Sequence, residues 1–397
     1  MINHFLESVL KDEVQDFIGS HEQSDIQQLL LKHKTIHQVP TPWIAQQILG
    51  RCKARFKLPS WYATKGIVYP PSLNLEQSSS EAAAKFKASL LQGVGDGGDL
   101  TGGFGVDTYF LSQNHPMHYV EPDEDLLQIV KHNHQVLGAA NITYHHGTAE
   151  TFLKTTRESF GFLFLDPSRR KATRKVYKLE ECEPDIIKLQ TEFFSRSDRV
   201  LLKTSPLYDL MQGCRELQNV AKIVVVAVAN ECKELLFMLQ KNFSGEPEVR
   251  AVDIYPKEDV VNSVSFSFPK EKDAVPAFSS PLQYLYEPNV AILKAGAFKW
   301  ISAEYKVFKL APSTHLYTSD DVVDFPGRIF KIREFVRLNK KLKDFFPNGY
   351  VNMIVRNYPL SVEEIKKKTG LKEGGDMYLL CTQTDQEKFA IVAERVK

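Results

Sequence analysis

Short apolar runs alternate with helical stretches between about residues 94 and 265, and this alternation constrains the fold more than any other feature. Runs of about four to eight residues rich in β-branched and aromatic side chains predict strands. Strands that alternate with helices predict a doubly wound, mostly parallel sheet. The expected strands are DGGDL, HYVE, ITYHH, FGFLFLD, RVLLK, KIVVVAVA and VSFSF, with ECKELLFMLQ predicted as helix. We expect an α/β fold with a seven-stranded sheet, whose last two runs pair antiparallel at one edge.

The segments on either side of this region predict further domains. The 397 residues exceed one ordinary domain. Helical periodicity predicts an N-terminal helical region over residues 1–75, and the sheet domain is expected over 76–270. After the polar connection FPKEKDAVPAFSSP, a C-terminal α+β part is expected. A change of pattern near Pro326 divides it into modules at 281–322 and 323–397.

Composition limits the partners and the location of the protein. The formal net charge is +1, so only a local patch can attract nucleic acid or a membrane surface. Five scattered cysteines without a C-x-x-C pair argue against zinc and disulfides, and the adjacent strand residues His145 and His146 point to opposite faces. We expect no metal. No apolar run reaches the length of a membrane span, so we expect no membrane partner and a cytoplasmic protein; no oligomeric state is predicted.

The stretch DLTGGFGVD follows the first predicted strand and suggests a ligand loop. Asp99, Gly103 and Gly105 fit the spacing D-x-x-x-G-x-G, in which glycines let the backbone lie close to a ligand. A nicotinamide cofactor would need a glycine where Thr108 stands, and Asp99 would repel its pyrophosphate. The cation S-adenosylmethionine carries no phosphate and suits the loop better. A glycine-rich turn without a ligand is the alternative. The loop residues expected to bind this cofactor are Asp99, Thr101, Gly102, Gly103 and Gly105.

The next two strand ends offer groups for the rest of such a cofactor. Glu121 lies eighteen positions after Gly103, where its carboxylate can accept hydrogen bonds from both ribose hydroxyls. Pro122 offers an apolar face to adenine, and the Thr148 hydroxyl or the Ala149 backbone can contact the adenine amino group. Taken alone, Glu121 is better explained as a solvated acid in the loop EPDED, but its distance from the glycine loop favours the ribose contact.

The fourth strand ends in a candidate catalytic loop. Oxygens of Asp166 and Pro167 could accept hydrogen bonds from a substrate amine at the carboxyl end of a central strand, where ligands bind in open α/β sheets. An ordinary Asp-Pro turn is the alternative. The expected catalytic residues are Asp166, Pro167, Ser168 and Arg169. The basic strip that follows could bind RNA phosphates or be merely solvated; its candidate contacts are Arg170, Lys171 and Arg174.

In this order the motifs resemble those of class I S-adenosylmethionine-dependent methyltransferases, over residues 76 to about 265. DLTGGFG resembles the family's nucleotide loop, Glu121 its ribose acid and DPSR its catalytic loop. EQSSSEAAAKFKA resembles the helix that precedes the core in RNA guanine-type methyltransferases. The C-terminal VRNYPLSVEEIKKKTGLKEGGDMYLL resembles ferredoxin-like and THUMP-like modules. The resemblance implies a Rossmann-like sheet, S-adenosylmethionine as cofactor and, through the THUMP-like module, RNA as partner.

Departures from the family patterns leave the substrate open. Base-amino methyltransferases read [DN]-P-P-[YFW], but here Ser168 and Arg169 replace the second proline and the aromatic residue. Carbon-5 uridine methyltransferases need a cysteine where Ser205 stands. The leading hypothesis is in-line methyl transfer to an RNA base nitrogen. The alternatives are a methyltransferase for a small molecule or protein, and a non-catalytic cofactor-binding RNA adaptor.

Overall fold

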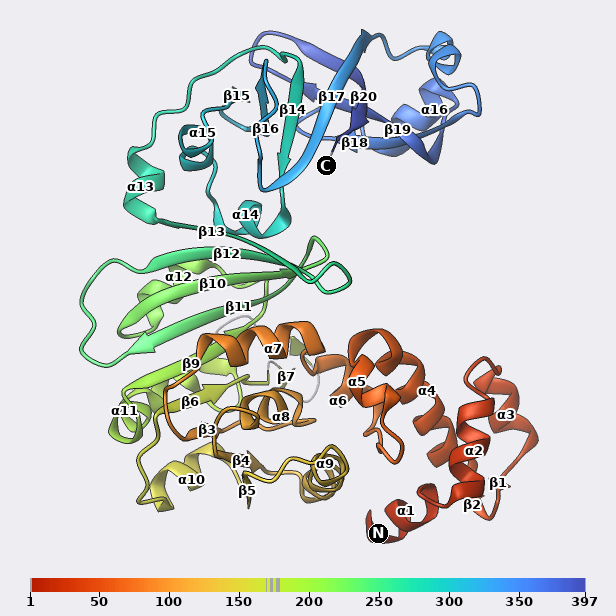
Figure 1. The fold of residues 1–397 in the computed structure, drawn as a ribbon, viewed down its shortest axis with the longest axis vertical. Coiled ribbons are helices and arrows are strands. Elements are labelled where there is room, and N and C mark those ends of the chain that lie inside the picture. Colours follow the sequence, from red (N-terminus) through yellow and green to blue (C-terminus); the bar gives the residue numbers. More distant parts are fainter. Residues whose placement is uncertain (1, 169, 172–173, 176–178, 397) are drawn as a thin grey trace. The chain divides into compact units, whose positions relative to one another are not determined.

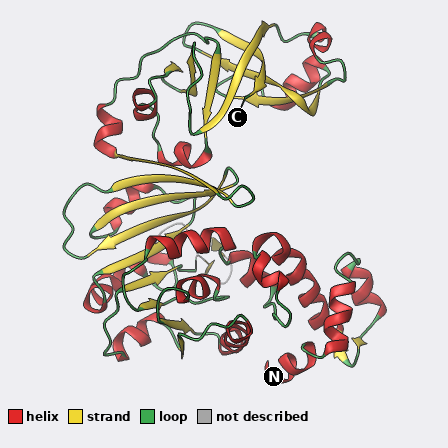
Figure 2. Cartoon of the chain, in the orientation of Figure 1, coloured by secondary structure: helices red, strands yellow, loops and turns green. Residues whose placement is uncertain are grey.

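The computed structural model describes residues 2–168, 170–171, 174–175 and 179–396; the side chains of 170–171, 174–175 and 341 are outside this description. The chain divides into two compact units, which are described separately. The first comprises Met1–Ala221 and Leu235–Gly245, and the second Lys222–Glu234 and Glu246–Lys397. Figure 1 labels the elements along the chain, and Figure 2 shows that helices predominate near the N-terminus and strands near the C-terminus.

The first unit begins with a group of helices around α4. The long helix α4 contacts α2, α3, α5 and α6. Ile44 and Ile48 of α4 are fully buried, as is Trp61 of α5. The elements are α1 (Ile2–Val9), α2 (Asp12–Ser20), α3 (Ile26–Lys32), β1 (Thr35–Ile36), β2 (Val39–Pro40), α4 (Thr41–Lys57), α5 (Pro59–Ala63), α6 (Ser72–Gln77) and α7 (Glu81–Leu90).

The rest of the first unit is a sheet with the strand order β11-β9-β6-β3-β4-β5. The five strands from β9 to β5 are parallel to their neighbours, and β11 pairs antiparallel with β9. The elements are β3 (Gly97–Asp99), α8 (Val106–Ser112), β4 (Met117–Glu121), α9 (Glu124–Val136), β5 (Ile142–His146), α10 (Ala149–Thr155), β6 (Phe162–Leu165), β7 (Arg170–Lys171), β8 (Arg174–Lys175), η1 (Leu179–Glu181), α11 (Ile186–Arg196), β9 (Arg199–Thr204), α12 (Leu210–Glu216) and β11 (Glu231–Gln240).

The direction of winding reverses at the centre of this sheet. From β3 the chain adds β4 and β5 on one side, then crosses back to add β6 and β9 on the other. The connections that leave the carboxyl ends of β3 and β6 therefore run in opposite directions along the sheet. In open α/β sheets, this reversal leaves a crevice outside the carboxyl ends of the strands, where ligands bind.

The second unit holds three strands in the order β13-β12-β10 and a seven-stranded sheet in the order β15-β16-β14-β17-β20-β19-β18. Its elements are β10 (Val220–Val228), β12 (Glu248–Tyr255), β13 (Val260–Ser267), α13 (Phe268–Asp273), β14 (Tyr284–Pro288), α14 (Val290–Ala295), α15 (Trp300–Glu304), β15 (Phe308–Ala311), β16 (Thr314–Ser319), β17 (Gly327–Val336), η2 (Lys340–Phe345), β18 (Tyr350–Val355), α16 (Val362–Thr369), β19 (Lys372–Gln383) and β20 (Lys388–Arg395).

The expected α/β fold with a mostly parallel, Rossmann-like sheet is confirmed, but its details need three corrections. Six strands of the first unit and three of the second replace the seven expected. ECKELLFMLQ is the strand β11, not a helix. Three consecutive apolar residues, Leu235, Leu236 and Phe237, are buried, a pattern that fits either element until β9 pairs with it. VSFSF lies in β13, which pairs with the unforeseen strand β12 and not with KIVVVAVA. Among the described helices, none is long and apolar enough to cross a membrane.

Candidate functional site at the carboxyl edge of the sheet

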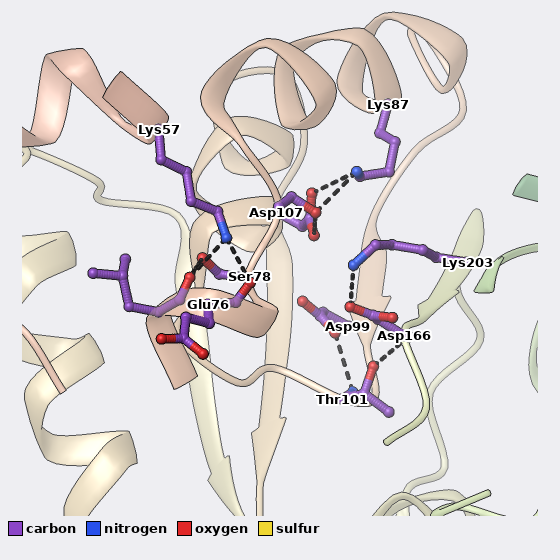
Figure 3. A network of polar contacts seen from close by, with 11 residues as sticks. Lys57, Glu76, Ser78, Lys87, Asp99, Thr101, Asp107, Asp166 and Lys203 are labelled. Atoms are coloured by element: carbon purple, nitrogen blue, oxygen red, sulfur yellow. Dashed lines mark hydrogen bonds and ion pairs between the residues drawn. The ribbon is translucent and has the colours of Figure 1, made fainter. Parts of the chain in front are cut away.

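Four ionisable side chains lie at or beside the carboxyl ends of neighbouring strands in the first unit. They are Asp99 (β3), Glu121 (β4), Asp166 (directly after β6) and Lys203 (β9). Figure 3 shows Asp99, Thr101, Asp166 and Lys203 close together, with Asp107 and Lys87 nearby. The parallel strands bring these residues to one edge, although they are far apart in the sequence.

Asp99 fixes the start of the glycine loop through hydrogen bonds to its side chain. Its side chain is buried, and its oxygens accept hydrogen bonds from the Thr101 amide (3.1 Å) and the Thr108 hydroxyl (2.5 Å). Burial is the main cause that raises the pKa of Asp99 to about 7; the hydrogen bonds from Thr108 and Thr101 oppose this shift, and the nearby carboxylates of Asp107 and Asp166 favour it. A cation bound near this cluster would therefore stabilise the ionised form.

The three glycines of the loop have different roles. A Cβ on Gly102 would lie 2.2 Å from the Tyr119 ring, so Gly102 permits close packing against β4. Gly103 and Gly105 both have positive φ, 54° and 73°. A Cβ on Gly105 would meet Val130 and the buried His134, whereas the nearest atom to a Cβ on Gly103 is 3.8 Å away. Gly103 is thus the one of these three glycines at which a Cβ would meet no close contact.

Glu121 connects the glycine loop to the start of α9. One carboxylate oxygen accepts from the Gly103 amide (2.8 Å) and the other from the Asp123 amide (3.0 Å). Burial raises the pKa of Glu121, and both amide hydrogen bonds oppose this effect. Each oxygen of a carboxylate can accept two hydrogen bonds, so the group retains acceptor capacity for a ligand. The adjacent Pro122 is exposed.

Thr148 and Ala149 lie where α10 begins. The exposed Thr148 is the N-cap residue, and its hydroxyl accepts a hydrogen bond from the Thr151 amide at 3.3 Å. Ala149, the first residue of the helix, is buried. In this conformation, the Thr148 hydroxyl stabilises the helix terminus.

The Asp166 loop is held on both sides. Its backbone amide donates to the Thr101 hydroxyl at 2.6 Å, which joins it to the glycine loop. Its carboxylate forms an ion pair with Lys203, a nearly buried residue of β9. Pro167 is buried, and the exposed Ser168 exchanges two backbone hydrogen bonds with Glu183 (2.8 and 3.0 Å). The Asp166 side chain, 32% exposed, therefore faces the edge from a fixed loop.

The basic residues after this loop lie partly or wholly outside the description. Arg169 is outside the described residues. Arg170 and Lys171 lie in β7 and Arg174 in β8, but their side chains are not among those described. Their expected role toward RNA remains a prediction.

A buried ion pair that the sequence does not reveal attaches α7 to this edge. The Lys87 ammonium is fully buried and lies 3.2 Å from the Asp107 carboxylate on α8. The Ser79 hydroxyl donates to Asp107 (2.7 Å) and accepts from Lys87 (3.0 Å). The helix α7 begins at Glu81, because Ser80 is its N-cap residue and accepts the capping hydrogen bond from the Ala83 amide. The SSS segment thus supplies both a cap and a partner for the ion pair.

Carboxyl groups outnumber ammonium groups at this edge. Four acids and two lysines meet there among the described residues: Asp99, Asp107, Glu121, Asp166, Lys87 and Lys203. A surplus of buried or partly buried acid attracts a cation and repels a pyrophosphate. In the described part of the chain, no group of three or more His, Cys, Asp and Glu is arranged to hold a metal ion.

Comparisons with known proteins agree with the C-terminal assignment and with the fold. Residues 284–326 match a ferredoxin-like domain family, and residues 327–395 match a family described as THUMP domain-like. A "putative methyltransferase" from Porphyromonas gingivalis W83 is 28% identical, with a TM-score of 0.85 over 98% of this chain and 99% of that one. No curated protein shows significant similarity.

Two further solved structures match a smaller part of the chain. An rRNA methylase from Streptococcus thermophilus is 18% identical, with a TM-score of 0.30 over 40% of this chain and 94% of that one. A "putative methyltransferase" from Streptococcus mutans, in complex with SAH, is 16% identical, with a TM-score of 0.31 over 41% of this chain and 96% of that one. The near full-length match to the Porphyromonas gingivalis protein and the two domain matches by themselves confirm the resemblance to methyltransferases that carry C-terminal ferredoxin-like and THUMP-like domains.

Proposed function

We propose that the chain is an S-adenosylmethionine-dependent methyltransferase that modifies RNA at a base nitrogen. The observation that carries the proposal is the convergence of the glycine loop, Glu121 and Asp166 at the point where the sheet reverses its winding. The near full-length similarity to a "putative methyltransferase" supports the reaction class. The THUMP domain-like match over residues 327–395 supports RNA as the substrate class.

The residues at this edge fit the cofactor chemically. At the positive-φ Gly103, a Cβ would have no neighbour closer than 3.8 Å, which supports the approach of a ligand to the backbone there. Glu121 can accept hydrogen bonds from ribose hydroxyls beyond those that it receives from Gly103 and Asp123, and Pro122 is exposed for contact with adenine. The acid surplus suits a cation. When bound, the cofactor supplies an electrophilic methyl group on a positively charged sulfur.

Asp99, Thr101 and Gly102 shape the cofactor loop in this proposal. Asp99 fixes the loop through hydrogen bonds from Thr101 and Thr108. The Thr101 hydroxyl in turn accepts a hydrogen bond from the Asp166 amide, which links the loop to Asp166. Gly102 and Gly105 allow the loop to pack against β4 and α9. Thr148 and Ala149, at the start of α10, complete the proposed adenine contacts.

Asp166 orients the nucleophile. Its carboxylate and the Pro167 carbonyl can accept hydrogen bonds from a base amino or imino group, which directs the nitrogen lone pair away from them. Lys203 keeps the Asp166 carboxylate in place. Ser168 is held against Glu183 by two backbone hydrogen bonds, and its proposed catalytic role and that of Arg169, which is outside the described residues, rest on the sequence of the loop.

The test is methyl transfer to RNA in vitro. The full chain is incubated with methyl-tritiated S-adenosylmethionine and total RNA from a strain that lacks the protein, and the label is mapped to a nucleotide by digestion. We expect label on a base nitrogen, lost in Asp166→Ala and retained in Asp198→Asn, a change at an exposed acid on the surface. Binding of S-adenosylhomocysteine without any label in RNA would refute RNA as the substrate. Failure to bind S-adenosylhomocysteine would refute the proposal altogether.

A further inference from the structure

An exposed aromatic side chain beside a cavity stands out in the N-terminal helices of the first unit. Phe56, in the last turn of α4, is 86% exposed, although most phenylalanines in the described chain are buried. It lines a cavity of about 380 Å³ between the end of α2 and the last two turns of α4. Ser20, Gln23, Cys52 and Arg55 also line it. An exposed ring that lines a cavity together with polar side chains is suited to stacking on a planar ligand.

The cationic groups of α4 distinguish this cavity from an ordinary solvated surface. Arg51 pairs with Glu22, Lys53 with Glu76, and Lys57 donates to the backbone carbonyls of Leu75 and Glu76. Arg55, in contrast, makes no ion pair or hydrogen bond with any residue that the structure describes; its guanidinium lies 5.8 Å from the centre of the Phe56 ring.

The carboxylate nearest to this cavity does not neutralise Arg55. Glu22 lines the cavity, but its two oxygens accept from Arg51 (2.7 Å) and from the Tyr62 hydroxyl (2.9 Å), and its side chain is 15% exposed. The exposed surface of the cavity therefore presents one uncompensated guanidinium beside one aromatic ring. Charge complementarity favours an anion attached to a planar group.

We propose that the Arg55–Phe56 cavity binds an unpaired nucleotide of an RNA strand, with the base stacked on Phe56 and the phosphate held by Arg55. Stacking on aromatic rings and phosphate contacts from arginine are the usual means of holding single-stranded RNA. Gln23 offers a donor and an acceptor to the base edge, whereas the Ser20 hydroxyl already donates to the Phe17 carbonyl. The inference rests on the proposed function, because it identifies where the RNA substrate is held outside the site of methyl transfer.

The helix α4 is linked through α7 to the edge of the sheet, so RNA bound at Arg55 and Phe56 would be held in a fixed relation to the site of methyl transfer. Lys57, next to Phe56 in the sequence, contacts the segment at Glu76 that leads into α7, and α7 is joined to the edge of the sheet through Lys87 and Asp107. Figure 3 shows Lys57 and Glu76 in the same view as Asp99 and Asp166. A strand held at Arg55 and Phe56 is therefore attached to the same body as the site of transfer, which favours a defined register of the substrate.

The test measures binding of the full chain to a fluorescein-labelled, single-stranded RNA of about twelve nucleotides and mixed sequence. We expect Phe56→Ala to weaken binding about tenfold. We expect Arg55→Gln to lower the slope of log K against log salt by about one phosphate contact. Leu31→Ala and Lys32→Gln are the matched controls, since Leu31 is 88% exposed and Lys32 is exposed on α3, and neither lines the cavity. The controls should bind like the original chain.

A local readout separates this site from other RNA contacts. Photocrosslinking with 4-thiouridine in the same RNA, followed by peptide mapping, should label the peptide around Phe56 and should lose that label in Arg55→Gln. Unchanged binding and crosslinking elsewhere would overturn this inference while leaving RNA as a substrate. An original chain that binds S-adenosylhomocysteine but no RNA would overturn the RNA part of the proposed function as well. Loss of self-association in Phe56→Ala, with RNA binding unchanged, would assign the surface to a protein contact and overturn the inference.

Discussion

Replacing Glu121 by glutamine tests the ribose contact on which the proposed cofactor site depends. The carboxylate oxygens accept from the Gly103 and Asp123 amides, at 2.8 and 3.0 Å. A glutamine keeps one acceptor oxygen and turns its NH2 group toward one of these donors. The substitution removes the negative charge with little change in size, so it affects the chemistry of the site more than its packing.

The expected loss of affinity follows from the hydrogen bonds at stake. A hydrogen bond to a charged group contributes about 1.5–3 kcal/mol, and two ribose hydroxyls would donate to this carboxylate. Losing one such bond and weakening the other gives about 3 kcal/mol, which is roughly 150-fold in the dissociation constant. The Gly103 loop would also lose part of its support, which can only increase this loss.

Isothermal titration calorimetry with S-adenosylhomocysteine measures the change directly. Glu124→Gln is the control, because Glu124 is an exposed acid in the first turn of α9, three residues along the chain. We expect the control to bind within about twofold of the original chain, as a surface charge contributes little. A Glu121→Gln chain that is folded by circular dichroism and binds within threefold of the original would refute the ribose assignment.

Three further predictions concern the charged groups at the same edge. Lys203→Met should lower the methylation rate constant at least tenfold with little change in cofactor affinity, because Asp166 loses the ion pair that positions it. An equal loss of the rate constant in single-turnover assays and of cofactor affinity in binding assays would contradict this. Because burial raises the pKa of Asp99 to about 7, Asp99 ionises between pH 6 and 8, and a bound cation favours its ionised form. Affinity for S-adenosylmethionine, relative to the uncharged thioether S-adenosylhomocysteine, should therefore rise over that interval in calorimetric titrations, and a flat ratio would count against a sulfonium near Asp99. Asp107→Asn should lower the free energy of unfolding by about 3 kcal/mol in urea titrations, because the fully buried Lys87 loses its counter-charge. A loss below about 1 kcal/mol would contradict the burial of this ion pair.

Local sequence signals predicted part of this structure well. Ser361 and Glu364 have the S-x-x-E spacing in the sequence and form a capping box at the start of α16, and Gly370 ends that helix with positive φ. The ends of β3 and β4 fall at Asp99 and Glu121, and Asp166 directly follows β6. These features depend on residues close in the sequence, or on the rule that parallel strands end at a common edge.

Features that depend on distant partners could not be predicted in this way. Lys203 lies 37 positions from Asp166, and a lysine in a strand reads equally well as a solvated side chain. Lys87 in α7 has the same ambiguity until Asp107 and Ser79 surround it. The run ECKELLFMLQ shows no clear period of either two or 3.6, so its identity as β11 depends on pairing with β9.

The distribution of charge explains how one chain could hold both a cationic cofactor and a polyanionic substrate. The site edge has more acids than lysines, which would repel the phosphates of RNA, while the formal charge of the whole chain is only +1. If the substrate is RNA, as proposed, its strand must therefore be held by cations outside the cofactor site, with a single base extended to Asp166. Arg55 is one such cation in the first unit. On this reasoning, salt should weaken RNA binding steeply while leaving S-adenosylhomocysteine binding nearly unchanged, because phosphate contacts release counterions and contacts to an uncharged thioether nucleoside do not.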